Sequence, residues 1–433
     1  MRFALRADIQ KNLRFNFTVN VLDGAFYGFA LGFASYVTVI PLFISTLTDS
    51  SVVIGLVAAM HGIGWQLPQL FTANRVARLR RYKPMALVMT LNERIPFVML
   101  AIIAFSLPTL GKNVALVLSL IAIVWQAMGS GLTGTAWQSM IAKIFPPQIR
   151  GTFYGTQSAA ANLTSSVSAV IGGWILSNVV APNNFAVCFL ITAGIMAISF
   201  VCLASAREPD APPAQEKTRS SREFWRALLE ILHRDGSFRI FLGVRMLSQV
   251  ASVGSAFFTV YAVRRFGMDA GTAGLMTGVL LLGQSISNPL LGWLGDRTSH
   301  RLMFALGILL AGAGAAVALF APSLNWFYLV FALAGFANAS LWTTAMAMSV
   351  EFGREEERPY YIGLANTLIA PATIAAPLLG GWLADAISYQ ATFAVAAISA
   401  VVTVLLVTGM RDPRKQHLTV EPLVAVSPYV EQP

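Results

Sequence analysis

Several ionisable side chains stand within long apolar stretches of this sequence. They include Asp23, His61, Glu93 and Arg245. Placing a charge in an apolar interior is costly, so such a group usually faces an opposite charge or a water-filled cavity. Carboxylates and imidazoles in such places also take up and release protons. We therefore interpret Asp23, His61 and Glu93 as candidates for proton coupling. The alternative for His61 is a hydrogen-bonded structural role.

Other polar side chains recur at the spacing of one helix face. Asn16, Asn20, Asp23 and Tyr27 follow one another at steps of four, three and four residues, which places them on one side of a helix. Three later apolar stretches carry similar stripes. The side chains that we expect to line a common cavity are Asp23, Tyr27, Gln126, Ser130, Arg245, Gln249, Asn338 and Trp342. The alternative is that these groups only join helices by hydrogen bonds, each contributing about 0.6 to 2 kcal/mol in a membrane.

Asp23 and Arg245 stand at similar depths from the same end of their apolar stretches. We therefore expect them to pair in one conformational state, because an unpaired charge at that depth would be far more costly. Arg245 also suggests a solute with an anionic or strongly hydrogen-bond-accepting group.

The composition places the chain in a lipid bilayer. Of 433 residues, 56% are hydrophobic and 12% are charged, whereas about a quarter of the residues of a soluble domain are charged. A spanning helix needs about 20 apolar residues, and such windows recur through nearly the whole chain. We predict twelve spans, at about 16–45, 51–73, 84–107, 114–142, 151–180, 184–206, 237–263, 271–292, 301–321, 325–350, 359–386 and 389–410. The predicted fold class is an all-α membrane protein.

The spans divide into two groups of six. We expect a cytoplasmic amphipathic segment at 1–15, an N-terminal bundle at 16–206 and a C-terminal bundle at 237–410. Between the bundles, 207–236 changes to Pro, Ala, Glu, Lys and Arg and ends in an amphipathic run, which predicts a cytoplasmic linker with a helix. The proline-containing tail, 411–433, has the composition of a disordered segment.

The basic residues indicate orientation rather than nucleic-acid binding. The net charge is +10, but most cations fall in short loops that lie on one side of the predicted membrane, as the positive-inside rule requires. We expect a multi-pass plasma-membrane protein, in the bacterial inner membrane, with both termini cytoplasmic. Arg264 and Arg265 fall on the outer side without explanation. We find no metal-spaced Cys and His set and no phosphate loop, so we expect no metal, no cofactor and no enzyme activity.

An internal repeat relates the two halves. Arg150, Gly155 and the triplet 172–174 have identical partners 208 residues later, at Arg358, Gly363 and 380–382. This offset predicts two parallel copies of a six-helix unit, related by a pseudo-twofold axis along the membrane normal, with a site between them.

A short loop between two apolar stretches carries the most specific pattern. Gly292, Leu294, Asp296, Arg297 and Arg301 follow the order glycine, apolar, acid, base and a basic close, with Ser299 in place of a second glycine. On these residues the chain, from about residue 15 to 410, resembles the major facilitator superfamily of membrane transporters. The resemblance implies two six-helix bundles that rock about a central cavity lined by helices 1, 4, 7 and 10. It also implies that helix 3, with Asn92, Glu93 and Arg94, supports the bundle as a structural polar lock.

The resemblance further implies a gate on the inner side. Asp296 would bind the N-terminus of helix 5 near Arg150, where the helix dipole favours an acid. The first half carries Ala77 where the second half has Asp296, and Arg78 where it has Arg297. The gate residues that we expect are Gly292, Asp296, Arg297, Arg301, Arg150, Arg78 and Arg358. In place of the lost acid we expect a charge clasp, in which Arg75, Arg78, Arg80 and Arg81 face Glu351, Glu355, Glu356 and Glu357.

The expected function is secondary transport of a small solute by a monomer, with a proton or another ion as a possible coupling partner. Trp125 stands where antiporters of the superfamily carry an arginine, and the Gly-Pro pair of their helix 5 is missing here, so support for drug efflux is weak. The alternatives are a transporter-derived sensor or structural protein without flux and a membrane-embedded enzyme.

Overall fold

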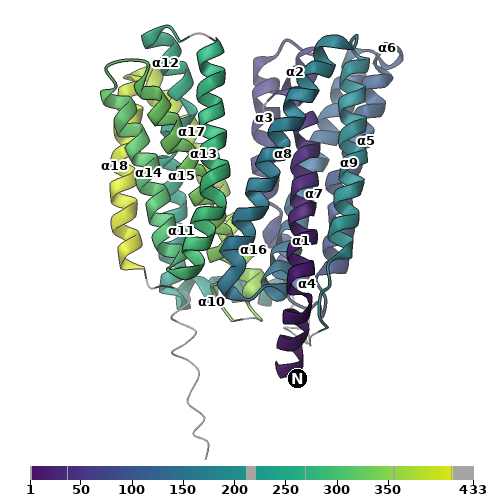
Figure 1. The fold of residues 1–433 in the computed structure, drawn as a ribbon, viewed down its shortest axis with the longest axis vertical. Helices are drawn as coiled ribbons and strands as arrows, with labels where there is room; N and C mark the ends of the chain where they lie inside the picture. Colours follow the sequence, from purple (N-terminus) through teal and green to yellow (C-terminus); the bar gives the residue numbers. More distant parts are fainter. Residues whose placement is uncertain are drawn as a thin grey trace, which may run out of the picture.

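The computed structural model describes residues 2–36, 38–210, 221–268, 270–354, 356–410 and 412. The chain forms two helical bundles that stand side by side (Figure 1). The first bundle contains α1 (Arg2–Phe33), α2 (Val39–Ser45), α3 (Ser51–Gln66), α4 (Gln69–Val76), α5 (Lys83–Phe105), α6 (Leu107–Leu110), α7 (Lys112–Ile144), the 3-10 turn η1 (Pro147–Ile149), α8 (Arg150–Asn178) and α9 (Asn183–Ser205).

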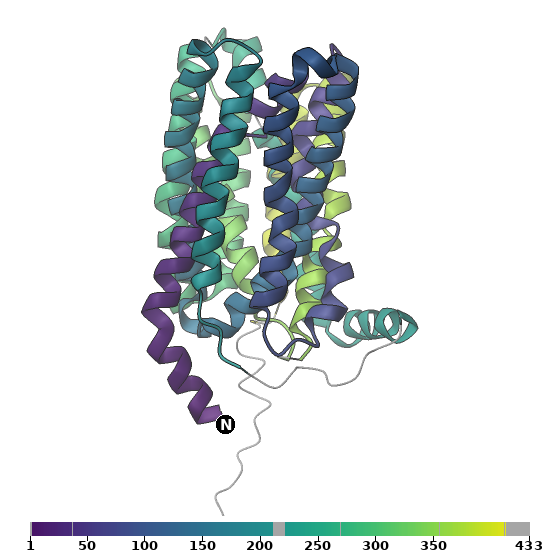
Figure 2. The ribbon, with the colours of Figure 1, turned by 90° about the vertical axis from the view of Figure 1, so that its right-hand side faces the viewer.

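The linker helix α10 (Ser221–Arg234) leads to the second bundle. That bundle contains α11 (Gly236–Ala251), the 3-10 turn η2 (Val253–Ala256), α12 (Phe258–Phe266), α13 (Ala270–Arg297), α14 (His300–Phe320), α15 (Trp326–Ser349), α16 (Arg358–Thr367), α17 (Ala370–Ala386) and α18 (Tyr389–Gly409). The N-terminus and α10 lie at the same end of the molecule, which we call the linker side; α2, α6 and α12 lie at the far side (Figures 1 and 2).

The expected twelve spans are formed by six segments in each bundle, four of which consist of two consecutive helical pieces: α1–α2, α3–α4, α11–α12 and α16–α17. Within the described residues, nine stretches are long and apolar enough to cross a membrane. The remaining three segments are α1, α3–α4 and α13. The pieces α3 and α4 have only 16 and 8 residues, while α1 and α13 include many of the polar residues of the bundle interior.

Three of the four interruptions in the predicted spans lie next to a proline. Pro41 lies in the first turn of α2, Pro68 stands immediately before α4, and Pro371 lies in the first turn of α17. Proline has no N–H to donate and its ring clashes with the preceding turn, so a helix ends before it or kinks. The fourth interruption, at η2 between α11 and α12, contains no proline. The apolar windows had predicted four unbroken spans at these places.

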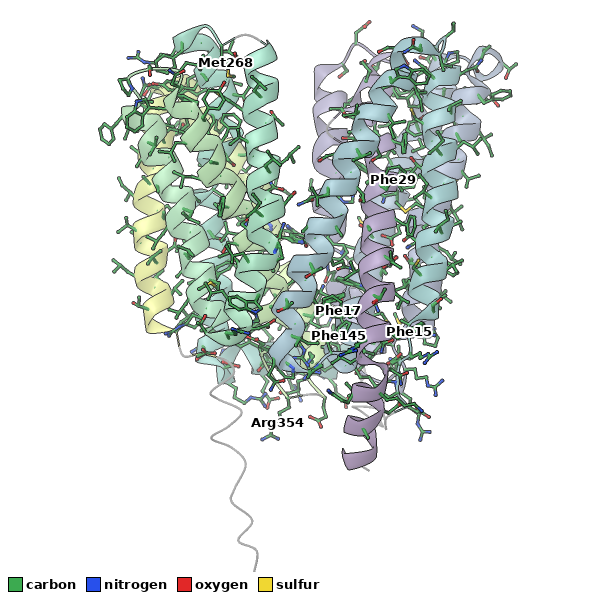
Figure 3. The ribbon with its side chains drawn as sticks, viewed as in Figure 1. Phe15, Phe17, Phe29, Phe145, Met268 and Arg354 are labelled. Carbon is green, nitrogen blue, oxygen red and sulfur yellow. The ribbon has the colours of Figure 1, made fainter. Side chains whose placement is uncertain are left out.

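The N-terminal segment differs from the expectation of a separate surface helix. α1 continues without interruption from Arg2 to Phe33, and its first turns project beyond the bundle on the linker side (Figure 2). Farther along, Phe17 packs edge-on against Phe145, with ring centroids 6.1 Å apart (Figure 3). Of the expected linker and tail, residues 211–220 and most of 411–433 lie outside the described part of the chain.

Arg264 and Arg265 occupy the last turn of α12, and Gly267 ends that helix in the left-handed conformation at φ 66°. Cations are favoured near a helix C-terminus because the carbonyl dipoles point toward them. The guanidinium of Arg264 also lies 5.5 Å from the ring centre of Tyr389. The C-terminal end of α12 and the ring of Tyr389 thus stabilise two cations whose position the positive-inside rule does not explain.

The repeat is reflected in how the bundles meet. α8 packs against α13, and α16 packs against α4, so the helices that begin at the repeated Arg150 and Arg358 each contact the opposite bundle. Gly155 faces the backbone of Asn288, and its counterpart Gly363 faces Leu70. The first of these two contacts joins two continuous helices. The second joins α4, which begins at an interruption, to α16, which ends at one.

The close approach of α8 to α13 can be tested at Gly155. A Cβ atom there would lie 2.1 Å from the carbonyl oxygen of Asn288, whereas a Cβ at Gly173 of the same helix would meet no heavy atom within 4 Å. We expect Gly155→Val to separate the bundles on the linker side and Gly173→Val to leave them in contact. A cysteine introduced at the fully buried Ser349, in a chain with Cys188 and Cys202 replaced by serine, should then react with maleimide faster only in the Gly155 variant. Equal labelling in both variants, each still eluting as folded protein in gel filtration, would contradict this packing.

Candidate functional site

A cavity of about 310 Å³ lies within the first bundle and reaches α15 of the second. Its wall includes charged or titratable side chains from three helices: Asp23 of α1, His61 of α3, and Glu93 with Arg94 of α5. Aromatic side chains supply much of the remaining wall, namely Tyr27, Trp65, Trp137, Tyr154 and Trp342. This combination of an apolar surface with a few convergent polar groups is typical of small-molecule sites.

Asp23, Glu93 and Arg94 form a buried charge cluster. A guanidinium nitrogen of Arg94 lies 2.8 Å from the Glu93 carboxylate, and the other terminal nitrogen lies 3.6 Å from the Asp23 carboxylate. That second nitrogen also donates to the Ser199 hydroxyl at 2.9 Å, which in turn donates to Asp23 at 2.6 Å. The three charged residues are 5% to 7% exposed. One cation therefore faces two carboxylates, and the cluster has a formal charge of −1 when both acids are ionised.

The cluster connects three helices of the first bundle. Arg94 donates from Nε to the carbonyl of Met196 on α9, at 3.2 Å, and its guanidinium carbon lies 5.9 Å from the ring centre of Tyr27. The Tyr27 hydroxyl donates to Glu93 at 3.4 Å. The residues expected to form a structural lock and those expected to couple protons thus belong to one cluster. This cluster both joins helices and faces the cavity.

Four polar atoms at the cavity wall are buried and make no hydrogen bond among the described residues. They are His61 Nδ1, Trp65 Nε1, Gln66 Oε1 and the Tyr154 hydroxyl. The His61 ring packs against Tyr36, with ring centres 4.8 Å apart. Buried polar groups normally have partners, so these atoms are available to hydrogen-bond a solute or water.

The second bundle contributes to the cavity mainly through Trp342 of α15. Its ring centre lies 6.3 Å from that of Trp65 on α3, and half of its surface is exposed. Trp137 and Tyr154 form another aromatic pair, at 5.9 Å. The Trp65–Trp342 contact therefore joins the two bundles at the cavity itself.

The structure brings some of the expected cavity residues together and separates others. Asp23, Tyr27 and Trp342 line the described cavity, as do the proposed coupling residues His61 and Glu93. Gln126 instead accepts a hydrogen bond from Tyr36, and Ser130 donates to the Ala127 carbonyl within its own helix. Gln249 and Asn338 are half-buried on α11 and α15, away from the cavity lining. A stripe at helical spacing identifies a buried face but not which neighbour covers it.

Asp23 does not pair with Arg245 in this conformation. The Arg245 guanidinium donates to the Ala365 carbonyl at 2.7 Å and to the Asn366 side chain at 3.2 Å, whereas Asp23 pairs with Arg94. Arg94 comes from a neighbouring helix of the same bundle, and Arg245 is held by the backbone of α16. The expectation of an anionic solute rested on Arg245, which here does not line the cavity.

Asp296 lies at the N-terminus of α8. Its carboxylate accepts hydrogen bonds from the backbone N–H of Gly151 at 2.9 Å and of Thr152 at 2.6 Å, and from the Thr152 hydroxyl at 2.7 Å. The first N–H groups of a helix have no partner within it, and the helix dipole favours an acid there. This is the contact that the loop pattern indicated. It joins α13 of the second bundle to α8 of the first, while Arg150 donates to the Phe145 carbonyl at 3.1 Å.

A histidine that the sequence analysis did not single out completes this contact. His300 is 1% exposed; its Nε2 lies 3.4 Å from Asp296 and its Nδ1 2.7 Å from Glu351. The imidazole thus stands between two buried carboxylates at the end of α13 and the end of α15. Its place in the loop was the available signal, because His300 begins α14 only three residues after Arg297 ends α13.

Three other expected gate residues, Arg78, Arg297 and Arg301, contact residues of their own bundle. Arg78 donates to the Asn74 carbonyl at 3.1 Å, Arg297 stacks on Trp293 with the guanidinium 4.0 Å from the ring centre, and Arg301 donates to the Met410 carbonyl. Gly292 allows contact with Gly151, because a Cβ at Gly292 would lie 2.1 Å from the Gly151 carbonyl oxygen. Arg358 begins α16.

Three members of the expected charge clasp between Arg75–Arg81 and Glu351–Glu357 have partners outside the clasp. Glu351 contacts His300, Glu357 accepts from Arg234 of α10 at 2.6 Å, and Arg81 lies 3.8 Å from Asp210. Hydrogen bonds to Glu357 and Tyr361 raise the pKa of Arg234. Glu355 lies outside the described residues. Partners from α14 and the linker are nearer than the opposite bundle, and sequence spacing gave no sign of them.

A buried amide network joins α4 to α16. The Gln69 side-chain oxygen accepts from Asn366 at 2.7 Å and from Gln138 at 3.3 Å. The Gln138 oxygen in turn accepts from the Ser349 hydroxyl at 3.2 Å, and the Asn366 oxygen accepts from Arg245. Gln69, Gln138, Ser349 and Asn366 are at most 1% exposed. The network connects both bundles on the linker side of the cavity.

The charge cluster gives a prediction about stability. Replacing Arg94 with Met leaves two carboxylates buried without their cation, and breaking a buried pair in this way costs about 3–5 kcal/mol of unfolding free energy. Adding Asp23→Asn and Glu93→Gln should recover much of that loss, because no buried charge then remains. Thermal melting of detergent-purified variants measures this, with the exposed Arg239→Met as control. A triple variant no more stable than Arg94→Met alone would contradict the assignment.

The amide network gives a prediction about conformation. Asn366→Leu removes the 2.7 Å donor to the Gln69 oxygen while the linker side is closed, and leaves that oxygen only the longer bond from Gln138 at 3.3 Å. Losing a hydrogen bond to a buried group costs about 1–3 kcal/mol. Water can satisfy that group once the linker side opens, so we expect the open population to rise about tenfold. Spin labels at the exposed Arg80 and Arg354 report the distance across this side. Asn178→Leu, at an exposed position of α8, should leave the distance distribution unchanged, and an unchanged distribution in the Asn366 variant would rule out a role for the network in closure.

The fold, the two repeated contacts and the central cavity define a membrane transporter of the two-bundle class. The family model described as Major Facilitator Superfamily matches residues 29–268 and 246–428. The chain belongs to the major facilitator superfamily.

Relatives at the level of sequence are distant. Multidrug resistance protein 1 of Bacillus subtilis is 24% identical over 147 residues, which are 34% of this chain and 38% of that protein. Protein spinster of Drosophila melanogaster is 26% identical over 153 residues, which are 35% of this chain and 25% of that protein. Each alignment thus spans well under half of the relative.

Solved structures are similar over almost the whole chain. The E. coli fucose:proton symporter FucP has a TM-score of 0.74 at 14% identity, over 92% of this chain and 98% of that one. The proton:xylose symporter XylE has a TM-score of 0.70 at 15% identity, over 93% and 98%. A bacterial homologue of the iron transporter ferroportin has a TM-score of 0.71 at 14% identity, over 91% and 98%. At these identities the likeness establishes the fold.

Proposed function

We propose that this chain is a secondary transporter that moves a small solute by alternating access and couples that movement to protons. The observation that carries the proposal is the buried charge cluster at the wall of a cavity that lies within the first bundle and reaches α15 of the second. Neither a sensor nor a structural protein needs two carboxylates and one arginine beside a cavity with unpaired hydrogen-bonding atoms. The solute would occupy that cavity and contact both bundles through Trp65 and Trp342.

The conformation supports an outward-facing state. The Asp296 contact and the amide network both join the bundles on the linker side, which would close that side. The structures of FucP and of the ferroportin homologue that share this fold are described as outward conformations. We propose that the far side is the external side, and that the network and the Asp296 contact open in the opposite state.

The distribution of cations supports the same orientation. The connection from α4 to α5 carries Arg78, Arg80 and Arg81 on the linker side, and basic residues accumulate in cytoplasmic loops. The linker side would therefore be cytoplasmic, with the N-terminus and linker inside. We propose a multi-pass plasma-membrane protein, in the bacterial inner membrane, that works as a monomer, because each monomer contains a complete cavity.

The charge cluster supports coupling to protons. With both acids ionised it carries −1, and an uncompensated charge is costly in a closed apolar interior. Uptake of a proton by Asp23 or Glu93 would make the cluster neutral before the bundles rock. FucP and XylE, which have the same fold, are described as proton symporters. The fold permits either direction of solute movement relative to the proton.

The cavity wall supports a solute with an apolar or aromatic body and a few hydrogen-bonding groups. Five aromatic side chains supply its surface, and the free polar atoms include donors at Trp65 and Tyr154 and an acceptor at Gln66. A volume of about 310 Å³ is at the lower end of the range of known ligand sites, about 300–1,000 Å³. The solute would therefore be small.

Transport in proteoliposomes tests this proposal. Counterflow of radiolabelled sugars, organic acids and amino acids and of fluorescent cationic dyes identifies a solute that exchanges. With that solute, we expect Asp23→Asn and Glu93→Gln to retain exchange but to lose accumulation driven by a pH gradient, because a neutral amide cannot carry the proton. Gly173→Val, remote from the cavity, serves as the control. If both amide variants still accumulate the solute against its gradient, proton coupling through the cluster is excluded; if no probe exchanges, the carrier assignment fails.

A further inference from the structure

The linker helix α10 has an exposed apolar surface that transport by the bundles does not use. Its fourteen residues, Ser221–Arg234, lie across the direction of the spanning helices. The helix is level with their linker-side ends and projects sideways from the bundles (Figure 2). A helix in this position runs along the plane of the membrane surface.

One face of α10 is packed against the second bundle. Phe224, Leu228 and Ile231 are 6%, 2% and 2% exposed and belong to the apolar cluster that includes residues of α11 and α16. The Phe224 ring lies 5.7 Å from that of Tyr360, and Arg234 is bound to Glu357. These contacts fix α10 to the start of α16.

The adjoining face is apolar but uncovered. Trp225 is 47% exposed and Leu229 is 57% exposed, and residues four apart lie on the same side of a helix. Successive side chains of a helix are about 100° apart around its axis, so Trp225 lies beside Phe224 in an end-on projection. In that projection the apolar side chains form one continuous arc of about 200°, with Ala227 at one edge and Leu229 at the other. The remaining arc is polar and exposed, with Arg222, Arg226, Glu230 and His233. The apolar arc is thus wider than the contact with the protein.

We infer that Trp225 and Leu229 insert into the bilayer at its boundary on the linker side. A helix with this division buries its apolar face about 5–10 Å into the region between headgroups and acyl chains. Tryptophan is enriched at that depth because its ring is apolar and its N–H is polar. The linker-side ends of the spanning helices lie at the level of α10 (Figure 2), so a bilayer around those helices would reach the face that carries Trp225 and Leu229. The polar arc then faces water.

Membrane insertion of α10 has a consequence for closure of the linker side. α10 holds the start of α16 through Phe224 and Arg234, and the Tyr360 hydroxyl of α16 donates to Asn74 of α4 at 3.3 Å. The bilayer would thereby set the depth of the helix that contacts the first bundle. The inference goes beyond the proposed transport function, because it requires only that the bundles span a membrane.

Spin labels on neighbouring positions of α10 test the insertion. A single cysteine replaces either Leu229 on the apolar arc or Glu230 on the polar arc, and both positions are exposed. The background is the full-length protein with Cys188 and Cys202 replaced by serine. In proteoliposomes of phosphatidylcholine and phosphatidylglycerol, relaxation of each label is measured with oxygen, which concentrates in hydrocarbon, and with a water-soluble nickel chelate. We expect the ratio of oxygen to nickel accessibility to be several-fold higher at Leu229 than at Glu230. Equal ratios, with both labels open to nickel, would place α10 in water and overturn the inference. Shielding of Leu229 from both reagents would show a protein cover and overturn it as well.

A functional comparison tests the link to closure. Trp225→Ser combined with Leu229→Ser removes the apolar contact with lipid, while Arg226→Ser combined with Glu230→Ser changes the polar arc of the same helix. We expect only the first pair to change the distance distribution between labels at Arg80 and Arg354, and only in proteoliposomes. The same change in detergent micelles and in bilayers would mean that the substitutions act within the protein, and the inferred role of lipid in closure would be wrong.

Discussion

A charge buried away from water must be compensated, and this requirement organises the first bundle. Arg94 reaches Asp23 of α1, Glu93 of its own helix and Ser199 of α9, so three helices meet at one guanidinium. Two acids and one base leave the group one charge short of neutrality, and the cavity beside it is where a proton or a solute can supply the difference. The same residues therefore hold the bundle together and make its interior responsive to what enters it. A fully neutral cluster would provide the first property without the second.

Closure of the linker side depends on backbone geometry as much as on side chains. Asp296 binds the first N–H groups of α8, and the glycines at that crossing bring backbone against backbone. At the other crossing, amides replace the acid and hydrogen-bond one another across the interface. Both contacts exchange protein partners for water when they open, so each contributes a modest free energy. That is suitable for a conformational equilibrium that must run in both directions.

The sequence predicted the features that depend on composition and on local spacing. The membrane class, the six-plus-six arrangement, the repeat and the position of Asp296 at a helix start follow from apolar windows, one constant offset and one loop. The partners of Arg245 and Arg81 did not follow, because in both cases a residue far away in sequence lies nearer than the expected one. The interruptions at Pro41, Pro68 and Pro371 also lay within apolar windows, where hydropathy outweighed the proline signal. Gln69 and Asn366 were missed because buried amides have no distinctive spacing.

The two crossings between the bundles differ in a way that bears on how they come apart. α8 and α13 each run through their contact as one helix, with Pro289 of α13 beside it. In contrast, α4 begins and α16 ends at an interruption next to their contact. A continuous helix carries a tilt along its full length, but an interrupted one lets a short piece swing while the rest stays in place. The bundles thus meet at one contact between two long helices, α8 and α13, and at one contact between two short helical pieces, α4 and α16. Opening of the linker side would begin at the short pieces, α4 and α16, and the Asp296 contact between α13 and α8 would open after them.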